Sequence, residues 1–210
     1  MRFRPSGVPL RRPFRWTRRT LLACAVVLLG YCGFVVVDGW IYQGQEGRRL
    51  DRLLHGRQEA APGADQIKKA AVSNPTVSAM AGDLIGRIEI PRLHLSVMVV
   101  EGISRAALRR AVGHIPGTAL PGGSGNVGIS GHRDTFFRPL RNVQYNDVIT
   151  LPTLFGEYRY RVVSTRVVAP ADIAVLNPVG YEVLTLVTCY PFYFVGPAPS
   201  RFIIRAERIA

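Results

Sequence analysis

The sequence predicts a mainly β protein, a barrel or a sandwich with only short helical pieces, preceded by a single N-terminal transmembrane helix. Three observations support this prediction. An apolar run lies behind an arginine-rich tail, a polar segment follows the run, and about 130 further residues alternate between short strand-like runs and Gly/Pro turns. A chain of 210 residues has room for one ordinary domain with appendages.

The basic charge of the chain is concentrated at its N-terminus. Residues 1–19 hold seven Arg and no acidic residue, in a chain whose net charge is +13. A basic excess spread over a folded surface would indicate nucleic-acid binding, but one placed just before an apolar run indicates membrane topology. We therefore expect a cytoplasmic tail over residues 1–19 and no nucleic-acid partner.

The apolar run extends over Thr20–Val37 and contains no formal charge. As a helix it would be about 27 Å long, enough to cross a hydrocarbon core. Trp16, Trp40 and Tyr42 flank it as interfacial anchors. We predict an uncleaved anchor at residues 20–42, with everything after residue 42 outside the cytoplasm. A cleaved signal peptide is the alternative, although no small-residue cleavage site follows the run.

The three cysteines divide between the anchor and the exported part. Cys24 and Cys32 lie in the apolar run and are expected to be inert. Cys189 is then the only cysteine outside the membrane, so no intramolecular disulfide can form there. An unpaired thiol in an oxidising compartment is either a buried core residue or a reactive group.

A polar segment separates the anchor from the folded domain. Residues 43–80 are predicted to be a stalk, in which Gly47–Gln58 places leucines at helical spacing and favours a short amphipathic helix. The folded domain is expected to occupy residues 81–210.

Seven strands are predicted in this domain, and a short helix is expected to begin at Ser104 and end near Ala111. The spacing is typical of an antiparallel barrel or sandwich. The predicted strands are Leu84–Ile90, Leu95–Val100, Asn126–Gly131, Val148–Leu151, Tyr158–Val168, Tyr181–Thr188 and Phe202–Ala206.

The sequence contains none of the short motifs that hold a cofactor. There is no Gly-rich phosphate loop, no CxxC or HExxH pattern, and the four His lie in different elements. We expect chemistry without a metal or cofactor.

Cys189 ends an apolar strand and is followed by aromatic and turn-forming residues. A thiol nucleophile needs a neighbour that can take its proton. His132 closes the NVGISG run at a strand-to-loop junction, where a scaffold presents a side chain to a cleft. His114 lies in a turn-rich stretch and is expected to have a structural role. His94 starts an alternating strand, where facing the solvent and facing the core are equally compatible with the sequence.

Arg201 opens the last predicted strand. A hairpin with the preceding strand would bring it beside Cys189, where its guanidinium could donate hydrogen bonds to an oxyanion. The alternative for each residue taken alone is plain: a buried Cys and an ordinary surface charge on a terminal strand.

Together these residues resemble a known family. Thr185–Cys189 (TLVTC) resembles the TLxTC signature of sortases, the membrane-anchored cysteine transpeptidases of bacteria. Gly131-His132 resembles the catalytic His after the fourth barrel strand, and Arg201 the essential Arg on the eighth. The stretches ISGHRDTFFRPL and TCYPFYFVGPAPSRF are most similar to class D sortases, including Gram-negative forms. The resemblance covers about residues 81–210 and implies a closed barrel of seven or eight strands.

The resemblance also implies a mechanism. The Cys189 thiolate would attack the Thr carbonyl of an LPxTG-like sorting signal, His132 would protonate the leaving amine, and Arg201 would stabilise the oxyanion. An amine acceptor in the cell wall or in a pilin would then take the acyl group. The candidate substrate-binding residues are Thr188, Tyr190 and Phe192.

Three local features accompany these assignments. The aromatic loop 190–194 is either a wall for the Leu-Pro part of the substrate or a loop packed on the barrel rim. Phe136 and Phe137 are expected in the core, under a short helix that steadies the His loop. Asn146-Asp147 replaces a Gly-Asp pair seen in many sortases, and Asn tolerates the left-handed backbone that such a turn needs.

Two other functions share parts of this pattern. L,D-transpeptidases also pair Cys with His, but they resemble a pattern with an SHGC-like run, whereas 57 positions separate His132 from Cys189 here. The non-catalytic alternative is a membrane-tethered β-barrel that binds envelope partners and simply buries Cys189.

Overall fold

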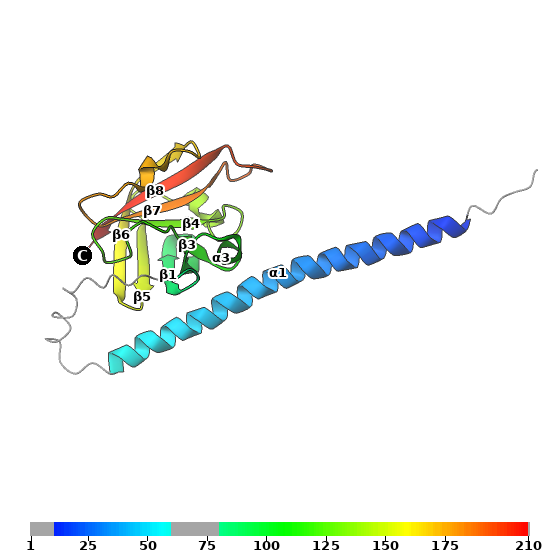
Figure 1. Ribbon diagram of the computed structural model, residues 1–210, viewed down its shortest axis with the longest axis horizontal. Coiled ribbons are helices and arrows are strands. Elements are labelled where there is room, and N and C mark those ends of the chain that lie inside the picture. The colour runs from blue at the N-terminus through cyan, green and yellow to red at the C-terminus, as the bar shows by residue number, and fades with distance from the viewer. Residues whose placement is uncertain (1–10, 60–79, 210) are drawn as a thin grey trace, which may run out of the picture. The chain divides into compact units, whose positions relative to one another are not determined.

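The computed structural model describes residues 11–59 and 80–209, and the chain divides into two compact units between Trp40 and Ile41. Parts of the predicted tail (1–10) and stalk (60–79) lie outside the described residues. The helices are α1 (Arg11–Glu59) and α3 (Arg105–Arg110), with short 3₁₀ turns η1 (Pro91–Leu93), η2 (Arg138–Asn142) and η3 (Ile173–Leu176). The strands are β1 (Leu84–Ile90), β2 (Leu95–Glu101), β3 (Val112–His114), β4 (Asn126–Gly131), β5 (Val148–Thr153), β6 (Gly156–Val168), β7 (Val183–Tyr190) and β8 (Ser200–Ile209) (Figure 1).

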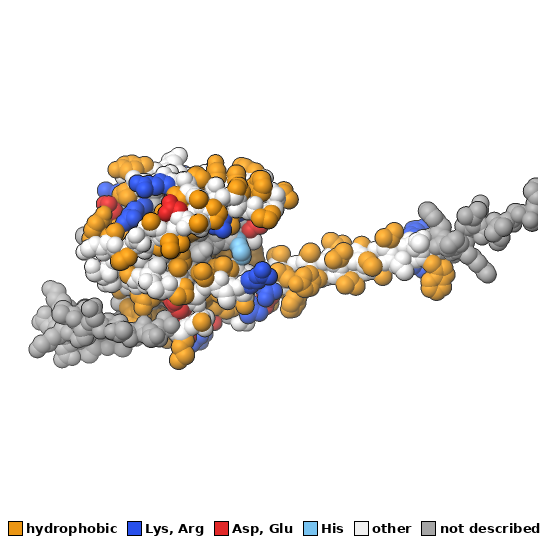
Figure 2. Space-filling view, turned by 45° about the horizontal axis from the view of Figure 1, so that its top comes forward, with side chains coloured by type: hydrophobic (Ala, Val, Ile, Leu, Met, Phe, Trp, Pro, Cys, Tyr) orange, Lys and Arg blue, Asp and Glu red, His pale blue; other side chains and the backbone are white. Residues whose placement is uncertain are grey.

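The first unit is the N-terminal part of α1. By length and composition, the helical stretch Trp16–Gly56 contains a window apolar enough to cross a membrane: its mean hydropathy is 2.5 and none of that window is buried. Figure 2 shows hydrophobic side chains along this part of the helix. The predicted N-terminal apolar helix is therefore confirmed, and the helix continues past residue 42 without a break.

The C-terminal part of α1, Ile41–Glu59, belongs to the second unit and packs on the barrel. The predicted amphipathic helix at Gly47–Gln58 is confirmed as part of it. Leu50 is completely buried, as the leucine spacing requires. The residues packed around it are Met98, Val100, Ala111, Tyr42, Leu54, Leu84, Ala107 and Leu154.

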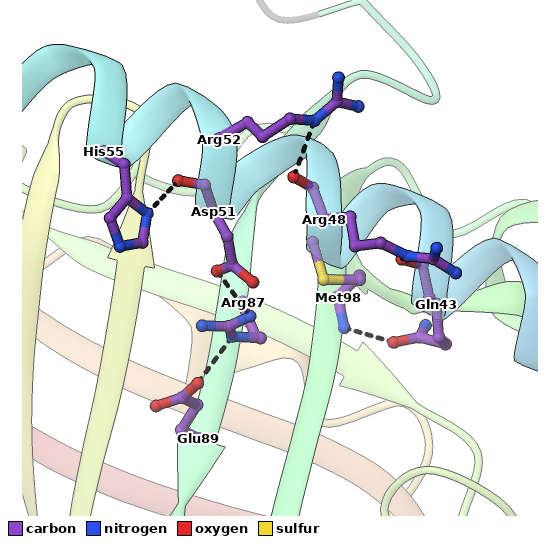
Figure 3. Close-up of polar contacts among 9 residues, drawn as sticks. Gln43, Arg48, Asp51, Arg52, His55, Arg87, Glu89 and Met98 are labelled. Atoms are coloured by element: carbon purple, nitrogen blue, oxygen red, sulfur yellow. Dashed lines mark hydrogen bonds and ion pairs between the residues drawn. The ribbon is translucent and has the colours of Figure 1, made fainter.

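Polar contacts also hold this helix on β1 and β2 (Figure 3). The Met98 amide donates to the side-chain oxygen of Gln43 over 2.9 Å, and Arg87 donates to Asp51 over 3.1 Å. Arg87 also pairs with Glu89 at 2.6 Å. The second unit therefore includes the start of the predicted stalk, so experiments on the folded unit should keep residues 41–59.

The eight strands form a closed barrel in the order β1-β2-β3-β4-β7-β8-β6-β5, which closes where β5 pairs with β1. The predicted barrel of seven or eight strands is confirmed. The expectation of a purely antiparallel sheet is wrong, because β2 pairs in parallel with β3 and β4 in parallel with β7. The strand that the sequence did not predict is β3, which has three residues and is too short to show a pattern.

The barrel interior is filled by alternate strand residues. In β7, Leu184 and Leu186 are fully buried in the main core, and in β8 Ile204 and Ala206 face the same interior. Because successive strand side chains point to opposite faces, the residues between them face outward. This alternation fixes which face of β7 and β8 carries Cys189 and Arg201.

The Asn146-Asp147 turn precedes β5 and is tied to η1. Asn146 has φ +70°, which confirms the left-handed backbone expected of this residue. Asp147 is buried, accepts hydrogen bonds from Arg92 and accepts a further one from the Gln144 amide at 2.8 Å. The hydrogen bond from Arg92 holds the pKa of Asp147 below its usual value of 3.8, against the opposing effect of burial.

This lowered pKa predicts acid sensitivity at one site. The folded pKa of Asp147 lies below the unfolded value, so its contribution to stability is complete above pH 3.8 and is lost as pH falls through the folded pKa. Asp147→Asn should therefore lower the free energy of unfolding at neutral pH, and the difference from wild type should shrink in acid. Urea unfolding of both proteins from pH 7 to pH 2.5 measures this, and a difference independent of pH would contradict it.

Candidate active site

The antiparallel pairing of β7 with β8 places Cys189 directly opposite Arg201. The predicted hairpin is confirmed, and both side chains lie on the outer face of the barrel because their neighbours Thr188 and Phe202 lie on the core side. Cys189 is partly exposed. A wholly buried core cysteine, the alternative drawn from the sequence, does not fit this placement.

The parallel pairing of β4 with β7 brings His132 to the other side of Cys189. Gly131 is aligned with Thr188, so His132 and Cys189 are the next residues along two neighbouring strand ends. His132 is exposed, and its ring makes no hydrogen bond to any part of the chain that the structure describes. Both ring nitrogens of the imidazole are thus open to a partner.

Gly131 is required by the core beneath the His132 loop. A Cβ added at Gly131 would lie 2.7 Å from the Phe137 ring and 2.8 Å from the Val112 side chain, closer than packed atoms allow. Phe137 is completely buried, and its amide donates to the His132 carbonyl over 3.0 Å. The predictions that Phe136 and Phe137 join the core packing and that a short helix follows are confirmed.

Thr188 holds the end of β4 against β7. Its hydroxyl donates to the Gly131 carbonyl over 2.7 Å, and the side chain is 2% exposed. The Thr next to Cys189 therefore fixes the backbone from which His132 extends.

Arg133 ties the His132 loop to the loop after Cys189. Its guanidinium donates to the carbonyls of Pro191 at 2.9 Å, Phe194 at 2.7 Å and Gly196 at 3.1 Å. Its charge also lies over the Phe194 ring, 5.8 Å from the centroid. A single side chain thus joins the loop that carries His132 to the loop that follows Cys189.

The aromatic residues after Cys189 pack partly on the barrel rim. Tyr190 stacks on Phe202 and meets Phe192 edge to face, each with centroids 6.0 Å apart, and Phe192 packs against the core. Tyr193 is instead 78% exposed and accepts a hydrogen bond from Arg141. Of the two predicted interpretations of this loop, rim packing describes Phe192, whereas Tyr193 faces solvent.

The guanidinium of Arg201 is held by the loop that precedes β8. It donates to the carbonyls of Ser200 at 3.1 Å and Ala198 at 3.4 Å, and it pairs with no carboxylate in residues 11–59 or 80–209. Its charge is therefore not neutralised within the described residues, and a guanidinium in this state is suited to bind an anionic group.

The remaining histidines of the domain, His114 and His94, lie away from Cys189, Arg201 and His132. His114 is buried and contacts the Glu101 carboxylate at 2.7 Å and the Ala119 carbonyl at 2.9 Å, which confirms its structural role. His94 is exposed at the end of η1. In the described part of the chain, no group of His, Cys, Asp or Glu is arranged to hold a metal ion.

Two supporting residues were not predicted from the sequence. Arg133 follows His132 directly, but its partners lie 58 to 63 positions away. Asn126, at the start of β4, bonds to Thr185 and to the carbonyls of Val175 and Asn177. A turn-rich loop without strand partners offers unpaired carbonyls, and this is the one sequence signal that could have indicated a role for Arg133.

Replacement of Arg133 tests its positioning role. Arg133→Ala removes three hydrogen bonds and should speed amide exchange in the loop 191–196 by on the order of tenfold or more. Arg133→Lys should restore part of the protection. Hydrogen exchange followed by mass spectrometry measures this, with Arg138→Ala, an exposed neighbour on η2, as the control. Equal exchange in Arg133→Ala and wild type would show that the contacts do not order the loop.

Comparison with known proteins agrees with this geometry. Residues 88–209 match the family model described as the sortase domain. Sortase D of Bacillus subtilis (strain 168) is 33% identical over 193 residues, covering 90% of this chain and 96% of the relative. The structure of a Sortase D5 transpeptidase from Clostridium perfringens is similar with a TM-score of 0.59 and 28% identity, covering 73% of this chain and 93% of that one. Sortase C from Clostridium perfringens SM101 is similar with a TM-score of 0.58 and 26% identity, covering 78% and 90%. The chain therefore belongs to the sortase family of cysteine transpeptidases.

Proposed function

We propose that this sortase is anchored in the membrane by α1, cleaves an LPxTG-like sorting signal with Cys189, and transfers the cut protein to an amine acceptor at the cell envelope. The observation that carries the proposal is the register of β7. This strand has Cys189 opposite Arg201 on one neighbour and beside the segment carrying His132 on the other.

In the first step, the Cys189 thiolate attacks the carbonyl carbon of the Thr in the sorting signal. An S–C bond forms, the C–N bond to the next residue breaks, and His132 gives its proton to the leaving amine. The product is a thioester between Cys189 and the new C-terminus of the substrate.

In the second step, an amine of the acceptor attacks the same carbonyl carbon. The amine loses its proton to His132, the C–S bond breaks, and Cys189 leaves as a thiolate. The new bond is an amide, and the enzyme returns to its starting charge state without a cofactor.

Arg201 acts on the tetrahedral intermediate of each step. Its donors now point to the carbonyls of Ala198 and Ser200. Moving one or two of them to the substrate oxyanion replaces neutral acceptors by a charged one, which strengthens the hydrogen bonds. The stabilisation is therefore greater in the transition state than in the free enzyme.

The three candidate substrate-binding residues divide by their placement. Thr188 is buried and bonded to Gly131, so we assign it a positioning role. Tyr190 is partly exposed and Phe192 supports it from the core side, and we assign this pair to the apolar wall beside the Leu-Pro part of the signal.

The anchor gives the proposed topology. The arginines before the apolar run favour a cytoplasmic N-terminus, so the barrel would face the periplasm or cell exterior. The partners are then proteins that carry a sorting signal and amine acceptors in the cell wall or in pilins.

A peptide-cleavage assay with the full chain in detergent micelles tests these roles. Cys189→Ala should reduce kcat/KM for an LPxTG peptide by on the order of 10⁴-fold or more, because the nucleophile is lost. Arg201→Lys should reduce it by about 10²- to 10³-fold, since lysine keeps the charge but loses the forked donors.

The matched controls are Cys24→Ala and Cys32→Ala in the apolar helix and Arg159→Lys on β6, at the far end of the β6–β8 pair from Arg201. All three should retain wild-type activity. Cleavage that survives Cys189→Ala would refute the assignment of the nucleophile.

A further inference from the structure

Residues aligned across β7, β8 and β6 form rows on the outer face of the barrel. The row that contains Cys189 and Arg201 ends at Val168 on β6. Two further rows follow at steps of two residues, because every second residue of a strand shares a face. The second row is Val187, Ile203 and Arg166, and the third is Thr185, Arg205 and Ser164.

A cavity of about 310 Å³ lies over these two rows. Its floor includes Ile203 and Arg205 on β8 and Arg166 on β6, and Asp172 lines the wall that leads into η3. The cavity therefore begins one row from the proposed nucleophile, on the Arg201 side of it.

The wall of the cavity is fixed by a buried amide. Asn126 is 2% exposed, and its side-chain oxygen accepts a hydrogen bond from Thr185 at 2.6 Å. Its side-chain nitrogen donates to the carbonyls of Val175 at 2.9 Å and Asn177 at 3.2 Å, at η3 and directly after it. Since both ends of the amide are satisfied, η3 is held over β4 and β7 and the cavity is already formed without a ligand.

The charges in the cavity are unbalanced. Arg205 is partly buried and Arg166 is exposed. Neither makes a hydrogen bond or ion pair with residues 11–59 or 80–209, and Asp172 pairs with neither of them. Two guanidinium groups against one carboxylate leave a net positive charge and a set of free donors, which match a carboxylate better than any neutral group.

The distance from Cys189 indicates which part of a substrate reaches this charge. Strand residues advance about 3.3 Å each, so the second and third rows lie about 7 and 13 Å from the catalytic row. An extended peptide advances by a similar amount per residue. A peptide whose scissile carbonyl lies at Cys189 therefore has the residue about four positions away beside Arg205.

The position of His132 selects the side of the scissile bond. The leaving amine must lie near His132, on the β4 side of Cys189, to receive its proton. The acyl part of the substrate then extends away from β4, obliquely along and across β8, toward the cavity. The residue four positions before the scissile Thr in LPxTG is the one directly before Leu.

We propose that this cavity is a basic subsite, formed by Arg205 and Arg166, that selects sorting signals with an acidic side chain directly before the Leu of the motif. The inference rests on the proposed function, because it takes Cys189 as the point where the scissile bond binds. It adds a specificity determinant outside the motif itself.

Peptides that differ only in the residue before Leu test the proposal. Glu, Gln and Lys versions are compared by kcat/KM with the full chain in detergent micelles. Wild type should prefer Glu over Gln by about five- to thirtyfold, mainly through KM, and added salt should reduce the preference. Arg205→Gln and Arg166→Gln should each weaken it, and Arg205→Glu should favour the Lys peptide instead.

Arg159→Gln removes the same charge from β6 outside the cavity and should keep the wild-type preference. Equal kcat/KM for the three peptides in wild type, or the same preference in Arg205→Gln and Arg166→Gln as in Arg159→Gln, would overturn the subsite. A preference found only for Glu placed after the scissile bond would overturn the assignment to the acyl side.

The Gln peptide separates this inference from the proposed function. If wild type cleaves it and Cys189→Ala does not, the proposed function holds whatever the charge preference is. If wild type cleaves none of the peptides, both the function and the subsite fail.

Discussion

Strand β7 is aligned in parallel with β4 on one side and antiparallel with β8 on the other, and each group of the proposed chemistry depends on these two alignments. The first brings His132 beside Cys189, and the second places Arg201 opposite it. A shift of one residue in either pairing would turn a side chain to the other face of the sheet. Such a shift would also expose Leu184 and Leu186, so the hydrophobic core that stabilises the barrel also fixes the site.

Side-chain contacts further restrain the end of β7 and the loops beside it. The Thr188 hydroxyl bonds to the Gly131 carbonyl, and Gly131 itself lies against Phe137 where no larger residue fits. Arg133 then joins the His132 loop to the loop after Cys189. The side chains are thus positioned by the backbones that carry them, which limits the reorganisation needed when substrate binds.

The sequence predicted much of this arrangement, and the parts it did not predict have a common cause. Cys189, Arg201 and His132 stand at strand ends, and the apolar or β-branched runs beside them made those ends visible. Strand β3 has only three residues, and its parallel pairing with β2 leaves no local pattern to detect. Turn chemistry was predictable at Asn146, where one residue decides the backbone conformation.

The partners of Arg133 and Asn126 could not be inferred in the same way. Each side chain bonds to backbone carbonyls about 50 to 60 positions along the chain, and backbone acceptors carry no residue identity. The same is true of the basic cavity, since Arg166 and Arg205 meet only through the pairing of β6 with β8. Position on a closed barrel, rather than local sequence, determines these relationships.

Trapping the acyl-enzyme is the most direct test of the role of Cys189. The full chain in detergent, in excess over an LPxTG peptide and without an amine acceptor, is quenched in acid, digested and analysed by mass spectrometry. The predicted result is the mass of the acyl fragment on the peptide containing Cys189, and its loss after addition of hydroxylamine. Cleavage with the acyl group on another residue, or with no covalent adduct at any time point, would contradict it.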